Sequence, residues 1–261
     1  MPDLPLIAPM LATPGPLPGP REDDRWAYET KLDGQRCVAY LPGDGTVRLR
    51  ARSGEDITAA YPELHGLAAD LGDVPAILDG EIVALDERGH SDFERLQQRM
   101  GLAGAPARAA RMAGEVPAHL MLFDVMYLRG GKLIDRPYRE RRVALEELGL
   151  RGPSWSTPAA IVGHGASALA ATREQGLEGL LCKRLDSRYA PGVRSRAWVK
   201  IRNVVTADVV IGGWLPGRGR LAGLPGAVLV GIRSEEGLRY AGAVGTGWTD
   251  RERAALAELR H

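Results

Sequence analysis

One octapeptide near the N-terminus organises the interpretation of this 261-residue chain: Glu29-Thr30-Lys31-Leu32-Asp33-Gly34-Gln35-Arg36. The surrounding residues, 26–40, predict a strand that is broken by a Lys-Leu-Asp-Gly turn. Only four of the 34 basic residues are lysine, and one of them stands just before this turn. An unprotonated lysine amine can act as a nucleophile, whereas arginine keeps its proton under all ordinary conditions. On its own, a lysine before an Asp-Gly turn is a weak signal, and other motifs must support it.

Composition predicts a packed protein and excludes several classes. Hydrophobic residues make up 44% of the chain and the net charge is +1, so contact with nucleic acid would need a local basic surface. The sequence has no apolar run of about 18 residues that could cross a membrane, and no signal peptide is evident in residues 1–10. Two cysteines, and five histidines without metal-ligand spacing, favour neither a disulfide framework nor a zinc site. We expect a cytoplasmic protein.

The pattern along the chain predicts a mixture of helices and strands. Residues 1–25 are rich in proline and read as extended, and residues 38–41 and 47–50 flank a Pro-Gly-Asp-Gly hairpin signal. Helices are predicted at 61–71, at 91–100 from a Ser91 cap, and at 139–148, 167–175 and 250–260. Further strands are predicted at 76–85 (interrupted at Asp79-Gly80), 119–128, 180–183, 198–201, 209–214, 227–233 and 238–244.

Composition shifts after Asn203, which predicts a first domain over residues 1–203 and a second over 204–261. The second contains three predicted strands with glycine-rich connections, followed by one helix. Three strands leave an open sheet with an uncovered edge, which is an awkward place for a small β domain to stop. An OB-fold has five strands, so residues 204–261 look like its N-terminal part.

Five further segments contain residues suited to nucleotide chemistry: Arg52-Ser53-Gly54, Leu78-Asp79-Gly80-Glu81-Ile82-Val83, Phe123-Asp124-Val125-Met126-Tyr127-Leu128, Glu178-Gly179-Leu180-Leu181-Cys182-Lys183 and Trp198-Val199-Lys200-Ile201-Arg202. Each has a plain structural alternative, such as a solvated acid, a core phenylalanine or an exposed strand face. A P-loop is not supported, because Gly131-Lys132 is followed by Leu133. Lys132 is predicted to lie in a surface turn without a catalytic role.

In this order and spacing the motifs resemble the covalent nucleotidyltransferases, and among them the ATP-dependent DNA ligases. The stretches Arg52-Ser53-Gly54-Glu55-Asp56-Ile57-Thr58 and Gln97-Gln98-Arg99-Met100 are most similar to bacterial end-joining ligases of the ligase D or ligase C type. The resemblance implies an α+β fold. It comprises an ATP-grasp-like nucleotidyltransferase (adenylation) domain with antiparallel sheets and flanking helices, followed by an incomplete OB-fold β domain.

The resemblance implies the groups that perform the chemistry. Lys31 would attack the α-phosphate of ATP and form a lysyl-AMP intermediate. Lys183 and Lys200 would neutralise the charge that develops on that phosphate. Glu178 would coordinate a divalent metal, Mg²⁺ or Mn²⁺, and Glu81 would bind the ribose or help to hold the metal. Phosphoryl-type transfer depends mainly on positioning and on charge neutralisation, which agrees with these residue types.

The remaining nucleotide contacts are also implied by the resemblance. Glu29 and Thr30 would flank the adenine, and Phe123 would stack on the purine. Arg36 and Arg52 would contact the phosphate and ribose region, and Arg52 would also grip the 5′-phosphate at a nick.

Contact with DNA is predicted from the segment 184–202, which has six basic residues against one acid. The nearest alternative is a solvated face. The expected contacts with the DNA backbone are Arg52, Arg188, Arg194, Arg196 and Arg202. The resemblance implies nicked or broken double-stranded DNA as substrate, other end-joining repair proteins as partners, and a place at the nucleoid.

One departure from the family concerns the C-terminal region. Family members continue into a complete OB domain that ends in a basic motif, and nothing similar follows Tyr240; Asp250-Arg251-Glu252-Arg253 is a poor match. We therefore expect weakened adenylation of Lys31 by ATP, with AMP binding and sealing of a pre-adenylated nick preserved. Two alternatives stay open: a ligase fragment that binds nucleotide or nicked DNA, and an RNA ligase or GTP-using capping-type enzyme.

Overall fold

The computed structural model describes residues 4–204, 206–235 and 237–258. The chain divides into two compact units, Met1–Asn203 and Val204–His261. Among the described residues, no helix combines the length and apolar character needed to cross a bilayer. Cys37 and Cys182 are buried free thiols, which agrees with the absence of a disulfide framework. Each unit is described separately.

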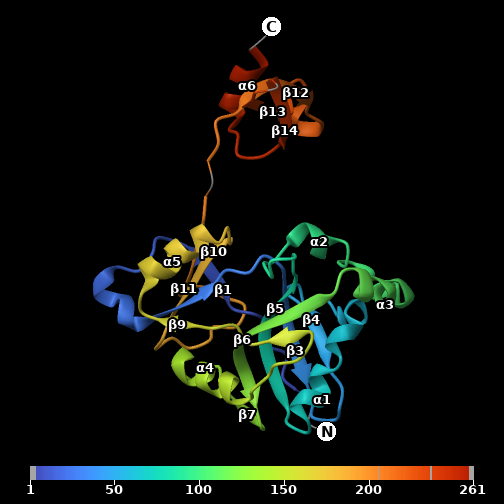
Figure 1. The fold of residues 1–261 in the computed structure, drawn as a ribbon, viewed down its shortest axis with the longest axis vertical. Coiled ribbons are helices and arrows are strands. Elements are labelled where there is room, and N and C mark those ends of the chain that lie inside the picture. Colours follow the sequence, from blue (N-terminus) through green and yellow to red (C-terminus); the bar gives the residue numbers. More distant parts are fainter. Residues whose placement is uncertain (1–3, 205, 236, 259–261) are drawn as a thin grey trace. The chain divides into compact units, whose positions relative to one another are not determined.

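The first sheet of the larger unit has five strands in the order β1-β11-β10-β2-β9 (Figure 1). Its strands are β1 (Leu11–Pro14), β2 (Trp26–Thr30), β9 (Ile161–Val162), β10 (Gly179–Arg184) and β11 (Arg194–Arg202). All pairings are antiparallel except that of β1, which runs parallel to β11. Part of the proline-rich N-terminal segment thus becomes an edge strand, which is a position where proline is tolerated.

The second sheet has the order β4-β3-β5-β6-β7, and a sixth strand, β8, pairs in parallel with β6. Its strands are β3 (Gln35–Leu41), β4 (Arg48–Ala51), β5 (Ala76–Ala84), β6 (Ala118–Leu128), β7 (Gly131–Lys132) and β8 (Trp155–Ser156). The predicted hairpin is confirmed as β3 and β4. The expected antiparallel sheets are confirmed in the main, and the two parallel pairings, β1 with β11 and β8 with β6, both involve short strands.

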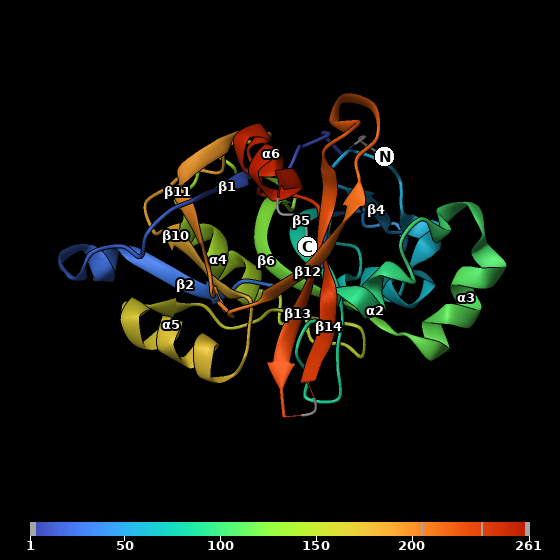
Figure 2. The same ribbon diagram turned by 90° about the horizontal axis from the view of Figure 1, so that it is seen from above.

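The helices of the larger unit lie mainly on the outer faces of the two sheets: α1 (Leu67–Leu71), α2 (Phe93–Gln97), α3 (Pro106–Glu115), α4 (Tyr138–Glu147) and α5 (Gly165–Glu174). Leu169 of α5 packs with Tyr28 and Leu180 of the five-stranded sheet. Leu96 and Met112, from α2 and α3, belong to the core behind the six-stranded sheet. Figure 2 shows α5 beside β2, with α2 and α3 on the opposite side of the unit.

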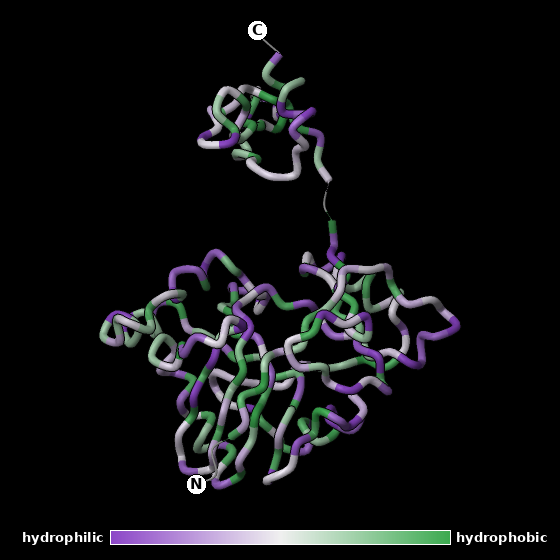
Figure 3. The backbone as a smooth tube through the Cα atoms, turned by 180° about the vertical axis from the view of Figure 1, so that it is seen from behind, coloured by the Kyte–Doolittle hydropathy of each residue, from purple (hydrophilic) through white to green (hydrophobic). Residues whose placement is uncertain are grey.

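The inner faces of the two sheets pack against each other. Ile7, Val38, Ile77, Met126 and Trp198 belong to one buried cluster, although they come from different sheets and from the N-terminal segment. Strand alternation explains how each sheet is buried on both sides, since successive residues point to opposite faces. Hydrophobic stretches accordingly run along the strands (Figure 3). The space between the sheets is where polar residues of the motifs must converge.

Several local predictions change in the structure. The predicted strand 26–40 becomes β2 and β3, which belong to different sheets. The predicted interruption at Asp79-Gly80 is a shift in the register of β5 with β6 and not a break, because β5 continues through both residues. Helix α2 is shorter than expected and is capped by Asp92, whose carboxylate accepts from the Arg95 backbone N–H at 3.0 Å. The predicted helix 61–71 consists of one short 3-10 turn, Pro62–Leu64, and α1.

The smaller unit contains an antiparallel sheet in the order β12-β13-β14. Its elements are β12 (Val210–Pro216), β13 (Pro225–Ser234), β14 (Gly237–Val244) and α6 (Asp250–Glu258), so the three predicted strands and the helix are confirmed. The last two residues of the predicted helix, 259 and 260, lie outside the described residues. Arg253 of α6 donates to the carbonyl oxygens of Pro225, Gly226 and Gly245, which holds the helix against the sheet.

Candidate active site

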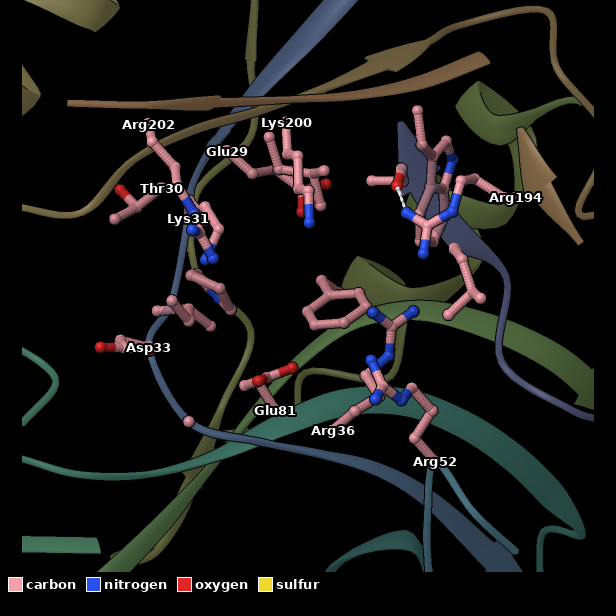
Figure 4. Close-up of a pocket in the computed structure, with 18 residues that line it drawn as sticks. Glu29, Thr30, Lys31, Asp33, Arg36, Arg52, Glu81, Arg194, Lys200 and Arg202 are labelled. Carbon is pink, nitrogen blue, oxygen red and sulfur yellow. Dashed lines mark hydrogen bonds between the residues drawn. The ribbon is translucent and has the colours of Figure 1, made fainter. Parts of the chain in front are cut away.

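A pocket of about 300 Å³ opens between the two sheets of the larger unit. Its charged and hydroxyl-bearing lining comes from segments far apart in the sequence: Glu29, Thr30, Lys31, Asp33, Arg36, Arg52, Glu81, Arg194, Lys200 and Arg202. Figure 4 shows these side chains arranged around one central space. Apolar and aromatic residues complete the wall: Leu11, Ala12, Leu32, Gly34, Phe123, Pro158, Leu181 and Trp198.

The strand register explains why these residues meet. Glu29 of β2, Leu181 of β10 and Lys200 of β11 are direct neighbours across three strands and therefore share one face. In the other sheet, Arg36 of β3 lies opposite Glu81 of β5. The predicted alternation of β11 is confirmed, because Lys200 and Arg202 line the pocket while Val199 and Ile201 pack on the outer core.

Two glycines allow the backbone to approach closely around Lys31. A Cβ on Gly34 would lie 2.2 Å from the carbonyl oxygen of Ile82, so only glycine fits where the loop passes β5. A Cβ on Gly179 would lie 2.0 Å from the carbonyl oxygen of Ile201, and its φ of +142° also favours glycine. The Lys31 backbone N–H donates to the Gly179 carbonyl at 2.9 Å, which ties the lysine loop to β10.

Lys31 makes an ion pair with Glu178, whose other carboxylate oxygen lies 3.3 Å from Arg202 Nε. Lys200 lies nearby, and the pKa of its ammonium is lowered by partial burial and by the charges of Arg202, Lys31 and Arg194. Glu178 thus stands among cations at the mouth of the pocket, although it is not part of the pocket lining. The structure brings together Lys31, Lys200 and Glu178 as the motifs suggested.

Arg36 is held in place by a buried acid that sequence reasoning assigned to a turn. The Asp79 carboxylate accepts two hydrogen bonds from Arg36, both at 2.7 Å, and a third from the Tyr189 hydroxyl. The guanidinium lies 4.6 Å from the centre of the Phe123 ring. Asp79 is fully buried because this pairing compensates its charge, which explains why β5 continues through it.

Lys183 occupies a different place from the one expected of a phosphate-neutralising group. Its side chain is fully buried behind the pocket wall, where the ammonium lies 2.9 Å from Glu29 Oε2 and donates to the Phe123 carbonyl at 3.1 Å. Burial lowers the pKa of this ammonium, and the charge of Glu29 opposes that effect. Lys183 lies on the same sheet face as Glu29 and Leu181, but the six-stranded sheet covers it.

Glu81 lines the pocket, and the pKa of its carboxyl is raised. Burial raises the pKa of its carboxyl to about 7, against the opposing charges of Arg36 and Lys31. Among the described residues, no group of three or more His, Cys, Asp or Glu side chains gathers as a preformed metal site. Any hard cation bound here would need ligands from a substrate or from water in addition to Glu81 or Glu178.

The raised pKa of Glu81 predicts a pH-dependent stability. Because the folded state favours the protonated carboxyl, this contribution is full below about 4.5 and is lost as pH rises through about 7. We expect Glu81→Gln to be more stable than the wild type by less than about 1 kcal/mol at pH 5 and by up to roughly 3 kcal/mol at pH 8. Urea unfolding of both proteins at pH 5, 6, 7 and 8 measures the difference. If the difference in free energy of unfolding between the two proteins is the same at every pH, the raised pKa of Glu81 is contradicted.

The arginines predicted to bind DNA fall into two groups. Arg52, Arg194 and Arg202 line the pocket, and Arg194 also donates to the Ala12 carbonyl at 2.6 Å. Arg188 and Arg196 are exposed and do not belong to the pocket lining. Lys132 is exposed in the two-residue strand β7 rather than in a turn, because it pairs with Tyr127 of β6.

Sequence reasoning missed several residues of this region, of which three affect the argument. Trp198 is fully buried at the pocket wall, and its indole nitrogen has no hydrogen-bond partner among the described residues. Leu181 faces the pocket between two charged motif residues, and strand alternation in the segment 178–183 was a usable signal for it. The third, Asp79, carried no usable signal, since an Asp-Gly pair is typical of turns.

Residues 9–202 match the family model described as the ATP dependent DNA ligase domain. The chain belongs to the ATP-dependent DNA ligase family. This match spans most of the larger unit and includes every residue of the pocket lining. It confirms the resemblance drawn from the motifs.

Relatives of this ligase chain include end-joining proteins. It is 43% identical over 253 residues to the multifunctional non-homologous end joining DNA repair protein LigD of Mycobacterium tuberculosis (strain ATCC 25618 / H37Rv), covering 97% of this chain and 31% of that protein. It is 38% identical over 259 residues to LigD of Pseudomonas aeruginosa, covering 97% of this chain and 29% of that protein. The ligase chain thus spans about a third of the length of these relatives.

Solved structures of ligase domains share the fold. The ligase domain of M. tuberculosis LigD matches with a TM-score of 0.66 and 42% identity, over 97% of this chain and 77% of that one. A mycobacterial DNA ligase D complexed with ATP and MES matches with a TM-score of 0.67 and 41% identity, over the same shares. The mixed α/β architecture with largely antiparallel sheets is therefore that of ATP-dependent DNA ligase domains.

Proposed function

We propose that this chain seals breaks between a 3′-hydroxyl and a 5′-phosphate in double-stranded DNA during end joining, with ATP as the source of AMP. The observation that carries the proposal is the charge of the pocket. Six basic side chains and three acidic ones line it, an excess of three positive charges around a lysine. Such a pocket suits a polyanion such as a nucleoside triphosphate and, next to it, a DNA phosphate.

The adenine is proposed to lie between Phe123 and Leu181. These side chains come from opposite sheets and both line the pocket, so a flat base could lie between them. An aromatic ring on one side suits the face of a purine. Glu29 and Thr30 lie at the end of β2 next to this space and are the proposed contacts to the base.

A divalent cation fits the chemistry of the residues present. Mg²⁺ binds through one or two carboxylates and completes its coordination with water and substrate phosphates. Glu178 and Glu81 would supply the carboxylates, and the cation would neutralise charge on the phosphates. A cation at Glu178 would also compete with Lys31 for this carboxylate, which releases the amine from its ion pair.

In the proposed reaction, the unprotonated Nζ of Lys31 attacks the α-phosphorus of ATP. An N–P bond forms, the bond between the α-phosphorus and the bridging oxygen breaks, and pyrophosphate leaves. An oxygen of the DNA 5′-phosphate then attacks the same phosphorus and releases Lys31. Finally the 3′-hydroxyl attacks the 5′-phosphate and AMP leaves. Lys200, Arg36 and Arg52 are the proposed stabilisers of negative charge along this path.

The test is joining of a nicked duplex by this chain with ATP and Mg²⁺, followed on a denaturing gel. A second duplex that already carries AMP on its 5′-phosphate separates the last step from the first. Joining of either duplex supports the proposed function. If only the pre-adenylated duplex is joined, the step that this chain performs poorly is the attack of Lys31 on ATP. If neither duplex is joined at high protein concentration, the proposed function fails.

Arg196 is proposed to contact the DNA backbone outside the pocket. Removing one phosphate contact is expected to lower the slope of log affinity against log salt concentration by about one. We therefore expect Arg196→Ala to weaken binding of nicked DNA at low salt and to flatten this slope, whatever the sequence of the duplex. Fluorescence anisotropy between 50 and 300 mM salt measures it. Arg111→Ala, at an exposed arginine of α3, is the control, and equal slopes for both variants would refute the contact.

The smaller unit is proposed to be the N-terminal part of an OB-fold. Its three antiparallel strands expose large apolar side chains, among them Leu215, Leu238 and Tyr240. Such a face is typical of a sheet that packs against further structure. Other end-joining proteins are proposed partners, and the nucleoid is the proposed place of action.

A further inference from the structure

The Glu29 carboxylate lies in the wall of the pocket and is held there by buried partners. It lines the pocket, yet the residue is only 3% exposed. Its contacts come from behind the pocket wall. Lys183 lies 2.9 Å from Oε2, and the Tyr138 hydroxyl donates to Oε1. A guanidinium nitrogen of Arg142 lies 4.0 Å from Oε1 and adds a second positive charge.

The residues that hold Glu29 are themselves fixed. Tyr138 is fully buried in the first turn of α4, and burial beside Glu29 raises the pKa of its hydroxyl well above the ordinary value, so the hydroxyl remains a donor. Arg142 donates to Glu146 and to the carbonyl of Pro158, which lines the pocket. Lys183 lies 4.4 Å from the centre of the Phe123 ring, so the same ammonium contacts both the acid and the aromatic wall.

We propose that Tyr138 is a positioning residue for Glu29 and that this positioning makes the pocket select a purine with a 6-amino group over one with a 6-oxo group. The inference rests on the proposed function, in which ATP occupies this pocket. With one lone pair of Oε1 used by Tyr138, the carboxylate is held in a single orientation and keeps acceptor capacity toward the base. An adenine amino group donates to it, whereas the guanine O6 is itself an acceptor and is repelled.

Removing the Tyr138 hydroxyl would change how the Glu29 carboxylate is oriented without removing the positive charges beside it. Lys183 and Arg142 both remain when the Tyr138 hydroxyl is removed, so the carboxylate keeps its cationic neighbours. What is lost is the hydrogen bond that restrains the carboxylate orientation. A site whose polar groups match one ligand and leave those of another unpaired discriminates strongly between them. Loosening the acceptor is therefore expected to reduce selectivity more than affinity for the triphosphate as such.

The experiment compares Tyr138→Phe with the wild type by calorimetric titration of ATP and of GTP, in EDTA so that no covalent adduct forms. Phenylalanine keeps the buried ring and removes only the hydroxyl. We expect the wild type to prefer ATP, and we expect the ratio of the GTP dissociation constant to the ATP dissociation constant to fall at least about tenfold in the variant. Tyr28→Phe is the matched control. Tyr28 is the neighbouring residue on β2 and donates to Asp23 at 2.6 Å on the opposite sheet face, so its loss is expected to leave the ratio unchanged.

The outcomes distinguish this inference from the function on which it rests. If the wild type binds neither nucleotide, the proposed function fails and the inference fails with it. If the wild type prefers ATP and Tyr138→Phe keeps the full preference, only the positioning role is overturned. Equal losses of affinity for ATP and GTP, or an equal loss of preference in Tyr28→Phe, would show a merely structural role and also overturn it.

Discussion

Replacing Lys31 with alanine is expected to abolish covalent attachment of AMP and to reduce ATP-dependent joining of nicked DNA by at least about 10⁴-fold. Lys31 lines the pocket on the loop between β2 and β3, and its backbone is tied to Gly179. Without its amine no other group at that point can form the N–P bond. Mass spectrometry of the protein after incubation with ATP and Mg²⁺ measures the adduct directly.

Two comparisons sharpen this result. Lys132→Ala removes an exposed lysine of β7 and is expected to leave the adduct at the level of the wild type. Joining of a duplex that already carries AMP is expected to fall far less in Lys31→Ala, because that step forms and breaks no bond to Lys31. An AMP adduct that persists in Lys31→Ala would assign the nucleophile to another residue, with Lys200 the nearest candidate in the pocket lining.

The second large effect is expected at Asp124. Arg141 of α4 and Asp124 of β6 are both fully buried, with guanidinium–carboxylate distances of 2.8 and 2.9 Å. Arg141 also donates to the carbonyls of Arg136 and Ser187. Removing one charge of a buried pair leaves the other uncompensated in a low-dielectric interior, which costs about 3–5 kcal/mol. We expect Asp124→Asn to lower the free energy of unfolding of the larger unit by this amount.

Glu140→Gln is the matched control for Asp124→Asn. Glu140 lies on α4, the helix that also contains Arg141. It pairs with Arg136 at 3.7 Å, but both side chains are about half exposed or more. Exposed ion pairs contribute roughly 0–1 kcal/mol, so little change is expected. Urea unfolding monitored by tryptophan fluorescence compares the three proteins. Equal, small losses in both variants would mean that the Arg141–Asp124 pair contributes no more than a surface pair.

Much of the pocket could be predicted because its residues lie in short, ordered motifs. Alternation along β11 was enough to place Lys200 and Arg202 on one face, and this holds in the structure. The sheet assignment could not be predicted in the same way. A Lys-Leu-Asp-Gly segment can join two strands of one hairpin or two strands of different sheets, and the sequence does not distinguish these cases. In the structure, β2 and β3 belong to different sheets.

The burial of Asp79 and that of Lys183 could not be predicted, for one shared physical reason. Both residues are charged and fully buried, which is rare for their types and requires a partner of opposite charge. Those partners, Arg36 and Glu29, are more than 40 residues away and on other strands. Local sequence contains no signal for such compensation. Helix α3 was missed for a different reason, since residues 101–115 are rich in glycine and alanine, although Pro106 stands at the start of the helix and its apolar residues gather on one face.

The parallel pairing of β1 with β11 has a consequence for how the protein is made. Thr13 Oγ1 donates to the Ser195 carbonyl across 182 residues, and the Met10 N–H donates to Tyr189 across 179. During synthesis β1 and β2 therefore leave the ribosome long before the strands that complete their sheet. Such distant pairing slows folding and leaves strand edges open to other chains in the meantime. Because β11 also supplies Arg194, Trp198, Lys200 and Arg202 to the pocket, the nascent chain has no complete pocket until almost the whole of this unit has been translated.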